Sequence, residues 1–174
     1  MFAMSPEPPG FRGALPSRRQ AVLIVDDEQD ILDALRHVLG AYLPEVEVVL
    51  ALTAAEGIDV LRARPIDLIV TDYKLPGMNG LEFLEEARRI APQVPRILIT
   101  AFPDVGLAID AINREHILNF IAKPLDPETI AGTIGAALAE RKAQEMRAHA
   151  FANALTALRR EVELGGARPG TQRR

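Results

Sequence analysis

The sequence predicts an α/β fold in which a doubly wound, five-stranded parallel sheet is followed by an extended C-terminal helix. Five short apolar runs alternate with five segments whose apolar residues have helical spacing, and this alternation is typical of parallel sheets with a helix on either face. Polar residues follow directly after several of the runs. The C-terminal stretch 128–164 contains no proline, so a single long helix is expected there.

The predicted strands are apolar runs that are too short to form helices. They lie at 22–25, 46–50, 67–70, 96–99 and 119–122. The third run begins at Asp67 and is closed by the turn-forming sequence Leu-Pro-Gly-Met-Asn-Gly at 75–80. We therefore expect a buried strand that delivers Asp72 into a loop.

The first two predicted helices have recognisable limits. From Ile31 onward, apolar residues recur every three or four positions, which predicts an amphipathic helix that ends at Gly40. Thr53 and Glu56 have the spacing of a capping box, in which each side chain bonds a backbone amide at the start of the helix. The second helix is expected to begin there and to end near Pro65.

The remaining predicted helices differ in length. The third is expected at 81–90 with a charged outer face, and the fourth is expected to begin at Asp104 as its N-cap. The last is expected to run from 128 to 164, since only Gly132 and Gly135 weaken its helix propensity. A helix of about 37 residues would be ~55 Å long, more than a single domain of this size requires.

Composition places the chain among globular proteins. It has 174 residues, 48% hydrophobic content and a formal charge of −4. The negative charge argues against direct binding of nucleic acid, and no apolar stretch is long enough to cross a membrane. The absence of cysteine excludes disulfides, thiolate metal sites and cysteine nucleophiles, and is compatible with the cytoplasmic location that we expect.

The chain is expected to divide into four parts. Residues 1–19, rich in proline and glycine, are predicted to be a disordered leader, and 165–174 a disordered tail. The folded domain is expected at 20–139 and a helical extension, a candidate coiled coil, at 140–164. Because few residues follow Lys123, we expect no appended DNA-binding or catalytic domain and an action through partner proteins.

Polar side chains end four of the five predicted strands. They are Asp26 with Asp27, Asp72, Thr100 and Lys123. The carboxyl ends of parallel strands meet at one edge of the sheet, so we expect these side chains to converge on one crevice. A lone aspartate at a strand end is more often a turn or capping residue, and the functional hypothesis therefore depends on the whole set.

The residue types in this set favour phosphoryl chemistry. Neighbouring carboxylates raise one another's pKa unless a cation neutralises them, and oxygen ligands without cysteine or clustered histidine favour Mg²⁺. The Thr100 hydroxyl and the Lys123 ammonium are donors suited to the oxygens of a phosphoryl group. Asp72 is the remaining candidate nucleophile.

This combination resembles the receiver domain of two-component response regulators over about residues 21–139. The features that carry the resemblance are the Asp-Asp-Glu after the first strand, Asp72 with its following loop, Thr100, and Phe-Ile-Ala-Lys-Pro at 120–124. The resemblance implies a flavodoxin-like strand order, 2-1-3-4-5, and a cis peptide before Pro124. A histidine kinase or a phosphotransfer protein would phosphorylate Asp72.

The resemblance also implies how Mg²⁺ would be held. Asp27 and Asp72 would be direct ligands together with the backbone carbonyl of Lys74. Asp26 would help to position the ion. A protein of this kind is not an enzyme in its own right, since it passes its signal to a downstream protein.

Further residues would contact the phosphoryl group or respond to it. By resemblance, Lys123 is the phosphate partner, and Thr100 and Phe120 form the conformational switch. Lys74 and Phe102, each two residues beyond a strand-end residue, flank the crevice. We expect them to influence how water reaches the phosphoryl group and therefore its lifetime.

Two other classes share some of these features. An aspartyl-phosphate phosphatase of the haloacid dehalogenase type also uses a strand-end Asp, Thr, Lys and Mg²⁺. That class usually carries Asp-x-Asp-x-Thr on its first strand, which Asp26-Asp27-Glu28 does not supply. A degenerate receiver that serves only as a scaffold is disfavoured, because all five key residues are present.

Apolar residues in the last predicted helix follow an alternating spacing of four and three. Two polar residues, Arg141 and Gln144, interrupt the pattern, whose positions are Ile130, Ile134, Ala137, Arg141, Gln144, Ala148, Phe151, Leu155, Leu158 and Val162. About two apolar heptads are fewer than the three to four that define a coiled coil well. We expect a homodimer through 148–162, with packing of the helix back on its own domain or binding to another protein as the alternatives.

Overall fold

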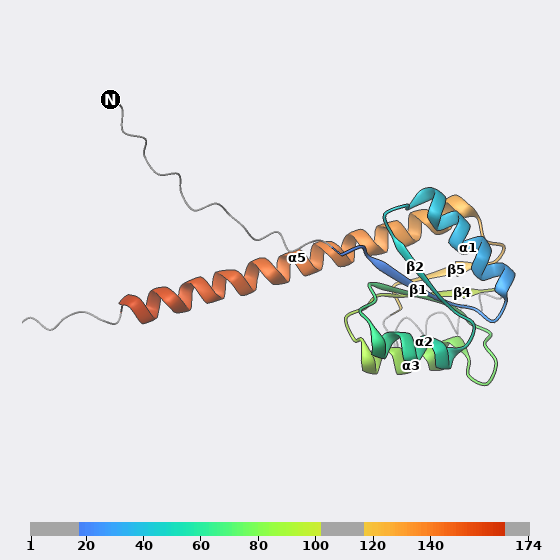
Figure 1. Ribbon diagram of the computed structural model, residues 1–174, viewed down its shortest axis with the longest axis horizontal. Helices are drawn as coiled ribbons and strands as arrows, with labels where there is room; N and C mark the ends of the chain where they lie inside the picture. The colour runs from blue at the N-terminus through green and yellow to red at the C-terminus, as the bar shows by residue number, and fades with distance from the viewer. Residues whose placement is uncertain (1–17, 102–116, 166–174) are drawn as a thin grey trace, which may run out of the picture.

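The computed structural model describes residues 18–101 and 117–165 (Figure 1). Its five parallel strands form one sheet in the order β2-β1-β3-β4-β5. The strands are β1 (Ala21–Val25), β2 (Glu47–Ala51), β3 (Leu68–Asp72), β4 (Arg96–Thr100) and β5 (Asn119–Ala122). The predicted fold class and strand order are therefore confirmed. The helix expected from Asp104, and Phe102 before it, lie outside the described residues.

Helices cover both faces of this sheet. They are α1 (Gln29–Tyr42), α2 (Ala54–Ala63), α3 (Gly80–Ile90) and α5 (Pro127–Gly165). The first part of α5 lies beside α1 on one face, while α2 and α3 lie together on the other (Figure 1). In the described part of the chain, no helix is long and apolar enough to cross a membrane.

The strands explain why two hydrophobic cores form. Successive strand residues point to opposite faces, so Val22 and Ile24 join the core under α1 and α5 while Leu23 and Val25 join the core under α2 and α3. Each of these four side chains is at most 1% exposed. Continuous apolar runs of this kind are typical of parallel strands that are buried on both faces.

The helix limits differ from the prediction at two places. Helix α1 continues past Gly40 to Tyr42, because the following Leu43 amide still donates to the Leu39 carbonyl at 2.8 Å and an exposed glycine costs only about 1 kcal/mol. At α2, Thr53 accepts from the Glu56 amide at 3.1 Å, but Glu56 accepts from the Leu52 amide at 2.8 Å. The Glu56 side chain thus bonds the amide one residue before Thr53, whereas a capping box would use the amide of Thr53 itself.

A complete capping box opens α3 and fixes the loop after β3. The Asn79 side chain accepts from the amides of Leu81 and Glu82 at 2.9 and 3.0 Å, and Glu82 accepts from the Asn79 amide at 2.9 Å. The sequence had suggested only a turn here. With α3 anchored in this way, Gly80 donates its amide to the Tyr73 carbonyl at 2.8 Å and lies against the end of β3.

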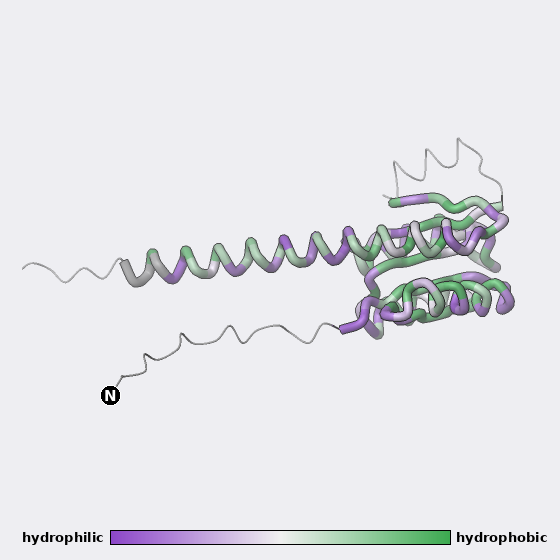
Figure 2. Tube along the Cα trace, turned by 90° about the horizontal axis from the view of Figure 1, so that it is seen from above, coloured by the Kyte–Doolittle hydropathy of each residue, from purple (hydrophilic) through white to green (hydrophobic). Residues whose placement is uncertain are grey.

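Helix α5 has one part inside the domain and one part outside it. Ile130, Ile134 and Leu138 are buried in the core, whereas Phe151 and Leu158 are 67% and 58% exposed. The helix continues beyond the domain as an isolated rod on which green apolar segments alternate with purple hydrophilic ones (Figure 2). The long helix expected at 128–164 is thus confirmed as a continuous element, Pro127–Gly165.

Residues just before β1 also belong to the ordered domain. Arg18 donates from both terminal nitrogens to the buried carboxylate of Asp67 at 2.7 Å, and Asp67 also accepts from the Ala21 amide at 2.8 Å. The Gln20 side chain donates to the Leu138 carbonyl at 2.9 Å, at the last buried turn of α5. These bonds connect β1, β3 and the point where α5 leaves the domain.

We predict that Gly80→Ala destabilises the protein by about 1–3 kcal/mol, because the added methyl group would overlap the backbone carbonyl of Asp72. Gly132→Ala is the matched control. A methyl group at Gly132 meets nothing within 4 Å, and alanine favours the helix by about 0.5–1 kcal/mol. Urea denaturation measures both, and a Gly80→Ala variant as stable as the parent would contradict the prediction.

Candidate functional site

The carboxyl ends of the strands bring together the polar residues predicted from sequence. Asp72 and Thr100 are the last residues of β3 and β4, and Asp26 and Lys123 directly follow β1 and β5. The strand β3 is longer than expected, so Asp72 belongs to the strand rather than to the loop. Asp26, Asp72 and Thr100 are 1%, 6% and 5% exposed, so these polar groups are held at a nearly dry edge of the sheet.

Asp72 has a defined partner for each of its carboxylate oxygens. The Lys123 ammonium lies 2.8 Å from Oδ1, and the Lys74 backbone amide donates to Oδ2 at 2.7 Å. The Lys123 backbone amide donates to the Thr100 carbonyl at 2.9 Å, which continues the β4–β5 ladder up to the lysine. The lysine is followed by a cis peptide to Pro124, as expected. Sheet pairing therefore positions the cation beside Asp72.

Asp26 is the most deeply buried acid of this group. Its Oδ1 accepts from the Glu28 amide at 2.9 Å, whereas its buried Oδ2 has no hydrogen-bond partner and lies 3.7 Å from the Lys123 ammonium. Burial raises the pKa of Asp26 above the ordinary value of 3.8, and the charges of Asp72 and Glu28 act in the same direction. The Glu28 amide and the Lys123 charge lower this pKa and offset part of the effect.

The same neighbouring carboxylates favour the charged form of Lys123. Burial by itself would lower the pKa of Lys123, but the hydrogen bond and charge of Asp72, followed by the charges of Asp26 and Glu28, raise it above its ordinary value. The ammonium group is therefore held in its charged form among three carboxylates. A fixed cation at this position can attract and orient a negatively charged phosphoryl group.

The donor set at this edge fits a hard cation. The Asp26 Oδ2 atom lies beside the Asp72 and Lys123 pair and accepts no hydrogen bond, and Asp27 is exposed immediately next to Asp26. Among the described residues, no group of three or more Asp, Glu, His or Cys side chains could hold a metal ion. A Mg²⁺ ion here would therefore need a backbone carbonyl and water as further ligands, which Mg²⁺ commonly uses.

The predicted switch residues lie on adjacent strands. Thr100 ends β4 and is buried, and Phe120 pairs with Leu98 between β4 and β5. The Phe120 ring is partly buried against the core under α2 and α3. Lys74 is exposed and contributes its backbone amide to Asp72. Thr100 pairs with Ala122, so Phe120 lies on the neighbouring strand two residues before the edge that carries the acids.

No individual role was predicted for Glu28. Its carboxylate lies 4.0 Å from the Lys123 ammonium, and its backbone amide bonds Asp26. Its position as the third acid of Asp-Asp-Glu was the available signal. That signal was ambiguous, because Glu28 also directly precedes α1, where acids commonly occur for their effect on the helix end.

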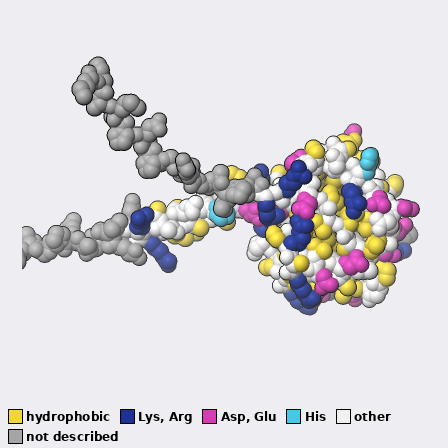
Figure 3. Space-filling view, in the orientation of Figure 1, with side chains coloured by type: hydrophobic (Ala, Val, Ile, Leu, Met, Phe, Trp, Pro, Cys, Tyr) yellow, Lys and Arg dark blue, Asp and Glu magenta, His cyan; other side chains and the backbone are white. Residues whose placement is uncertain are grey.

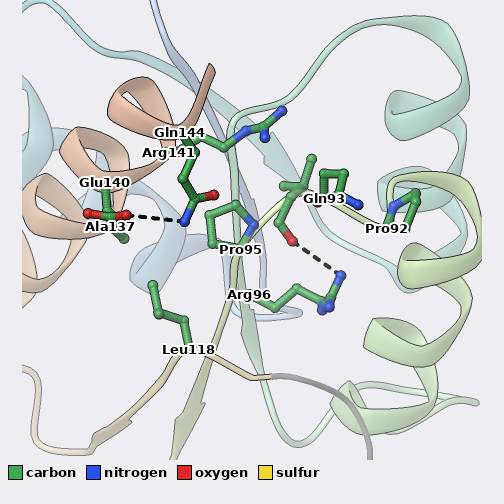
Figure 4. Close-up of a pocket in the computed structure, with 10 residues that line it drawn as sticks. Pro92, Gln93, Pro95, Arg96, Leu118, Ala137, Glu140, Arg141 and Gln144 are labelled. Atoms are coloured by element: carbon green, nitrogen blue, oxygen red, sulfur yellow. Dashed lines mark hydrogen bonds between the residues drawn. The ribbon is translucent and has the colours of Figure 1, made fainter. Parts of the chain in front are cut away.

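A second hollow lies at the opposite, amino-terminal edge of the sheet (Figure 4). It is lined by the loop before β4 and by the part of α5 that leaves the domain. Its polar groups have partners nearby, since Arg96 donates to the Val94 carbonyl at 3.1 Å and Gln144 donates to Glu140 at 3.2 Å (Figure 4). The strand-end acids and Lys123 lie at the carboxyl edge of the sheet, so we place the candidate functional site at that edge.

The fold and this site define a class of protein, a doubly wound domain with an acidic site and a lysine at its carboxyl edge. The chain belongs to the response regulator receiver domain family, whose profile matches residues 22–135. This confirms the resemblance inferred from the sequence. Proteins of this family receive phosphoryl groups in signalling pathways.

Two curated relatives show the breadth of the family. The hydrogenase transcriptional regulatory protein HoxA of Cupriavidus necator is 34% identical over 117 residues, 67% of this chain and 24% of that protein. The cyclic di-GMP phosphodiesterase response regulator RpfG of Xanthomonas campestris pv. campestris is 31% identical over 147 residues, 82% of this chain and 39% of that protein. The chain thus spans well under half the length of either relative.

Solved structures match the domain along nearly their whole length. The signal receiver domain of an HD domain-containing protein from Pseudomonas fluorescens Pf-5 has a TM-score of 0.70 at 30% identity, covering 78% of this chain and 98% of that one. A CheY-like receiver domain from Methanospirillum hungatei JF-1 has a TM-score of 0.66 at 30% identity, with coverages of 72% and 98%.

We predict that Asp26→Asn stabilises the metal-free protein at neutral pH by about 1 kcal/mol, because it removes a buried charge of which one oxygen lacks a hydrogen bond. A carboxyl group whose pKa is raised on folding favours the folded state at low pH and loses that contribution as the pH rises through the raised value. The stability gain should therefore be small near pH 4 and grow toward pH 7. Urea denaturation in a chelating buffer at both pH values checks the sign, and a loss of stability at pH 7 would contradict it.

Proposed function

We propose that this chain accepts a phosphoryl group on Asp72 from a histidine kinase or a phosphotransfer protein and then signals through contact with another protein. The observation that carries the proposal is the pairing of Asp72 Oδ1 with the Lys123 ammonium at 2.8 Å, beside the buried and incompletely bonded Asp26. A carboxylate placed next to a fixed cation is a suitable acceptor for an anionic group, because the cation can offset the added negative charge.

The chemical step follows from this geometry. An oxygen of the Asp72 carboxylate attacks phosphorus as the bond from phosphorus to the donor's imidazole nitrogen breaks, and the imidazole leaves with that electron pair. Lys123 and the Thr100 hydroxyl are then placed to balance charge on the phosphoryl oxygens. Bound Mg²⁺ would supply further positive charge there, held by Asp27, Asp72 and the Lys74 carbonyl with help from Asp26.

The same contacts support a conformational output. A phosphoryl group on Asp72 would compete for the Lys123 ammonium and attract the Thr100 hydroxyl. Movement of Thr100 would free space beside β5, into which the half-buried Phe120 ring could turn. The surface near β5 would then differ between the two states, and a downstream protein could recognise the difference.

The extension of α5 supports self-association as part of this function. Phe151, Leu155, Leu158 and Val162 form a stripe whose members are 46–76% exposed in the single chain. Hydrophobic side chains are visible along the extension in Figure 3. Burial of each large apolar side chain is worth about 1.5–3 kcal/mol, and an isolated helix of this length is marginal in water. A second copy of the chain offers the same stripe, and we propose a homodimer.

Radiolabelled acetyl phosphate with Mg²⁺ tests the phosphoacceptor. We expect about one stable label per parent chain and none above background for Asp72→Asn, because an amide oxygen is a poor nucleophile. Asp59→Asn, which changes an aspartate whose side chain is 80% exposed, should label as the parent does. Full labelling of Asp72→Asn would remove the assignment. Turnover of many equivalents without retained label would favour the haloacid dehalogenase type of phosphatase.

Light scattering of the full chain tests the homodimer. We expect a dimer at tens of micromolar for the parent and a monomer for Leu155→Glu/Leu158→Glu, because two charges per chain would enter the seam. Met146→Glu is the matched control, since Met146 is 65% exposed but lies outside the seam positions. It should remain dimeric. A monomeric parent would refute the homodimer and favour binding of the stripe to another protein or packing of the helix back on its own domain.

A further inference from the structure

The charges beside the apolar stripe of α5 distinguish two ways in which copies of this helix can pair. With Ala148, Phe151, Leu155, Leu158 and Val162 as the seam, two rows of residues flank it. One row contains Glu145, Ala152 and Arg159, and the other contains Glu140, Arg147 and Ala154. The charged members of both rows are at least partly exposed and can reach a second helix.

A parallel pair matches these rows poorly. In parallel coiled coils, each residue of the row that contains Glu140 faces the residue five positions later in the partner's row that contains Glu145. Glu140 would face the partner's Glu145, while Arg147 would face an alanine and Arg159 would face an alanine. The flanking positions named here thus give one like-charge pair and no opposite-charge pair. At the seam, Arg141 would also face its own copy.

An antiparallel pair matches them well. Each row then faces itself, so with the two-fold axis near residue 153 Glu145 faces the partner's Arg159 twice in the dimer. Ala152 and Ala154 face their own copies at the axis, where small side chains allow the helices to approach. In the seam, Ala148 packs against the partner's Leu158 and Phe151 against the partner's Leu155. Small and large residues therefore alternate across the contact, which favours even packing.

The surroundings of the two charged residues agree with this arrangement. Arg159 borders a shallow hollow formed by Leu155, Leu158 and Val162 on the extension. Glu145 bonds Arg141 within the same helix at 2.9 Å, yet its side chain remains 41% exposed. A carboxylate can accept from two cations, so the pair within the helix leaves room for an arginine of the partner.

The length of the extension fits the same register. With the axis near residue 153, Gly165 at the end of α5 lies level with the partner's Arg141. Arg141 borders the hollow at the domain edge in Figure 4, where α5 leaves the domain. The described helix therefore pairs along its whole free length and stops where the partner's domain begins.

From the charge pattern, the alternating side-chain sizes and the matched length, we propose that two copies of this chain pair antiparallel through 141–165. The two receiver domains then lie at opposite ends of the paired helices, and neither Asp72 site is covered by the other domain. The proposal rests on the homodimer proposed above and adds its orientation and register.

Cross-linking of single-cysteine variants tests the orientation, and the absence of native cysteine makes the readout specific. Ala152→Cys places thiols near each other at the two-fold axis only in the antiparallel pair. Ala148→Cys places them opposite each other only in the parallel pair, since antiparallel copies would be about 15 Å apart along the axis. With a short bifunctional maleimide we expect a several-fold higher dimer yield for Ala152→Cys. A higher yield for Ala148→Cys would overturn the orientation while leaving the homodimer in place.

Charge reversal provides an independent test by sedimentation of the full chain. Glu145→Arg and Arg159→Glu should each weaken the dimer on the order of tenfold, because two opposite-charge pairs become like-charge pairs, and the double variant should recover the parent affinity. Arg160→Glu, on the outer face, is the matched control and should have little effect. A parallel dimer would instead tighten with Glu145→Arg, and a double variant that stays weak would also overturn the proposal. A monomeric parent would refute the homodimer and the orientation together.

Discussion

The contact between the Lys123 ammonium and Asp72 is the interaction on which the polar edge of this domain depends. Two aspartates are buried at the ends of β1 and β3, where their charges repel each other and are poorly solvated. The lysine neutralises part of that charge from the end of β5, three strands away from β1 in the sheet. The parallel arrangement is what allows residues so far apart in sequence to meet.

The site is costly to maintain in the absence of a bound cation. Asp26 keeps one buried oxygen without a hydrogen bond, and buried groups of this kind destabilise a fold. Next to it, the loop after β3 is fixed by the Asn79 capping box and by the close approach of Gly80 to Asp72. Such a balance is common at functional sites, where local stability is reduced for the sake of binding.

Helix α5 continues the same spacing of apolar residues from the buried core into solvent. Its first turns complete the core through Ile130 and Ile134, and later turns present residues of similar spacing to solvent. Hydrogen bonds from Gln20 to Leu138, together with the Arg18 and Asp67 pair, hold the strand and helix segments at the point of exit. The core residues and the exposed stripe therefore belong to one continuous helix.

The sequence by itself determined the layers of the fold and the identity of the strand-end residues. Short continuous apolar runs and helices with three-to-four spacing are local patterns, and polar residues such as Asp72 and Thr100 stand at the ends of the runs. The predicted end of α1 at Gly40 was wrong. The helix continues to Tyr42, because the packing of the helix and the bond from the Leu43 amide outweigh the low helix propensity of one exposed glycine. Strand order came from resemblance to a family.

Only the tertiary structure decided how these residues act on one another. The contacts of Lys123 with Asp72 and Asp26 and the bond from Arg18 to Asp67 all join segments distant in sequence. A pattern along the chain records which side chains share a face, but it does not record how far apart two strands place them. The distances between the charged groups and the burial of those groups determine their interactions, and both follow from the packing of the whole sheet.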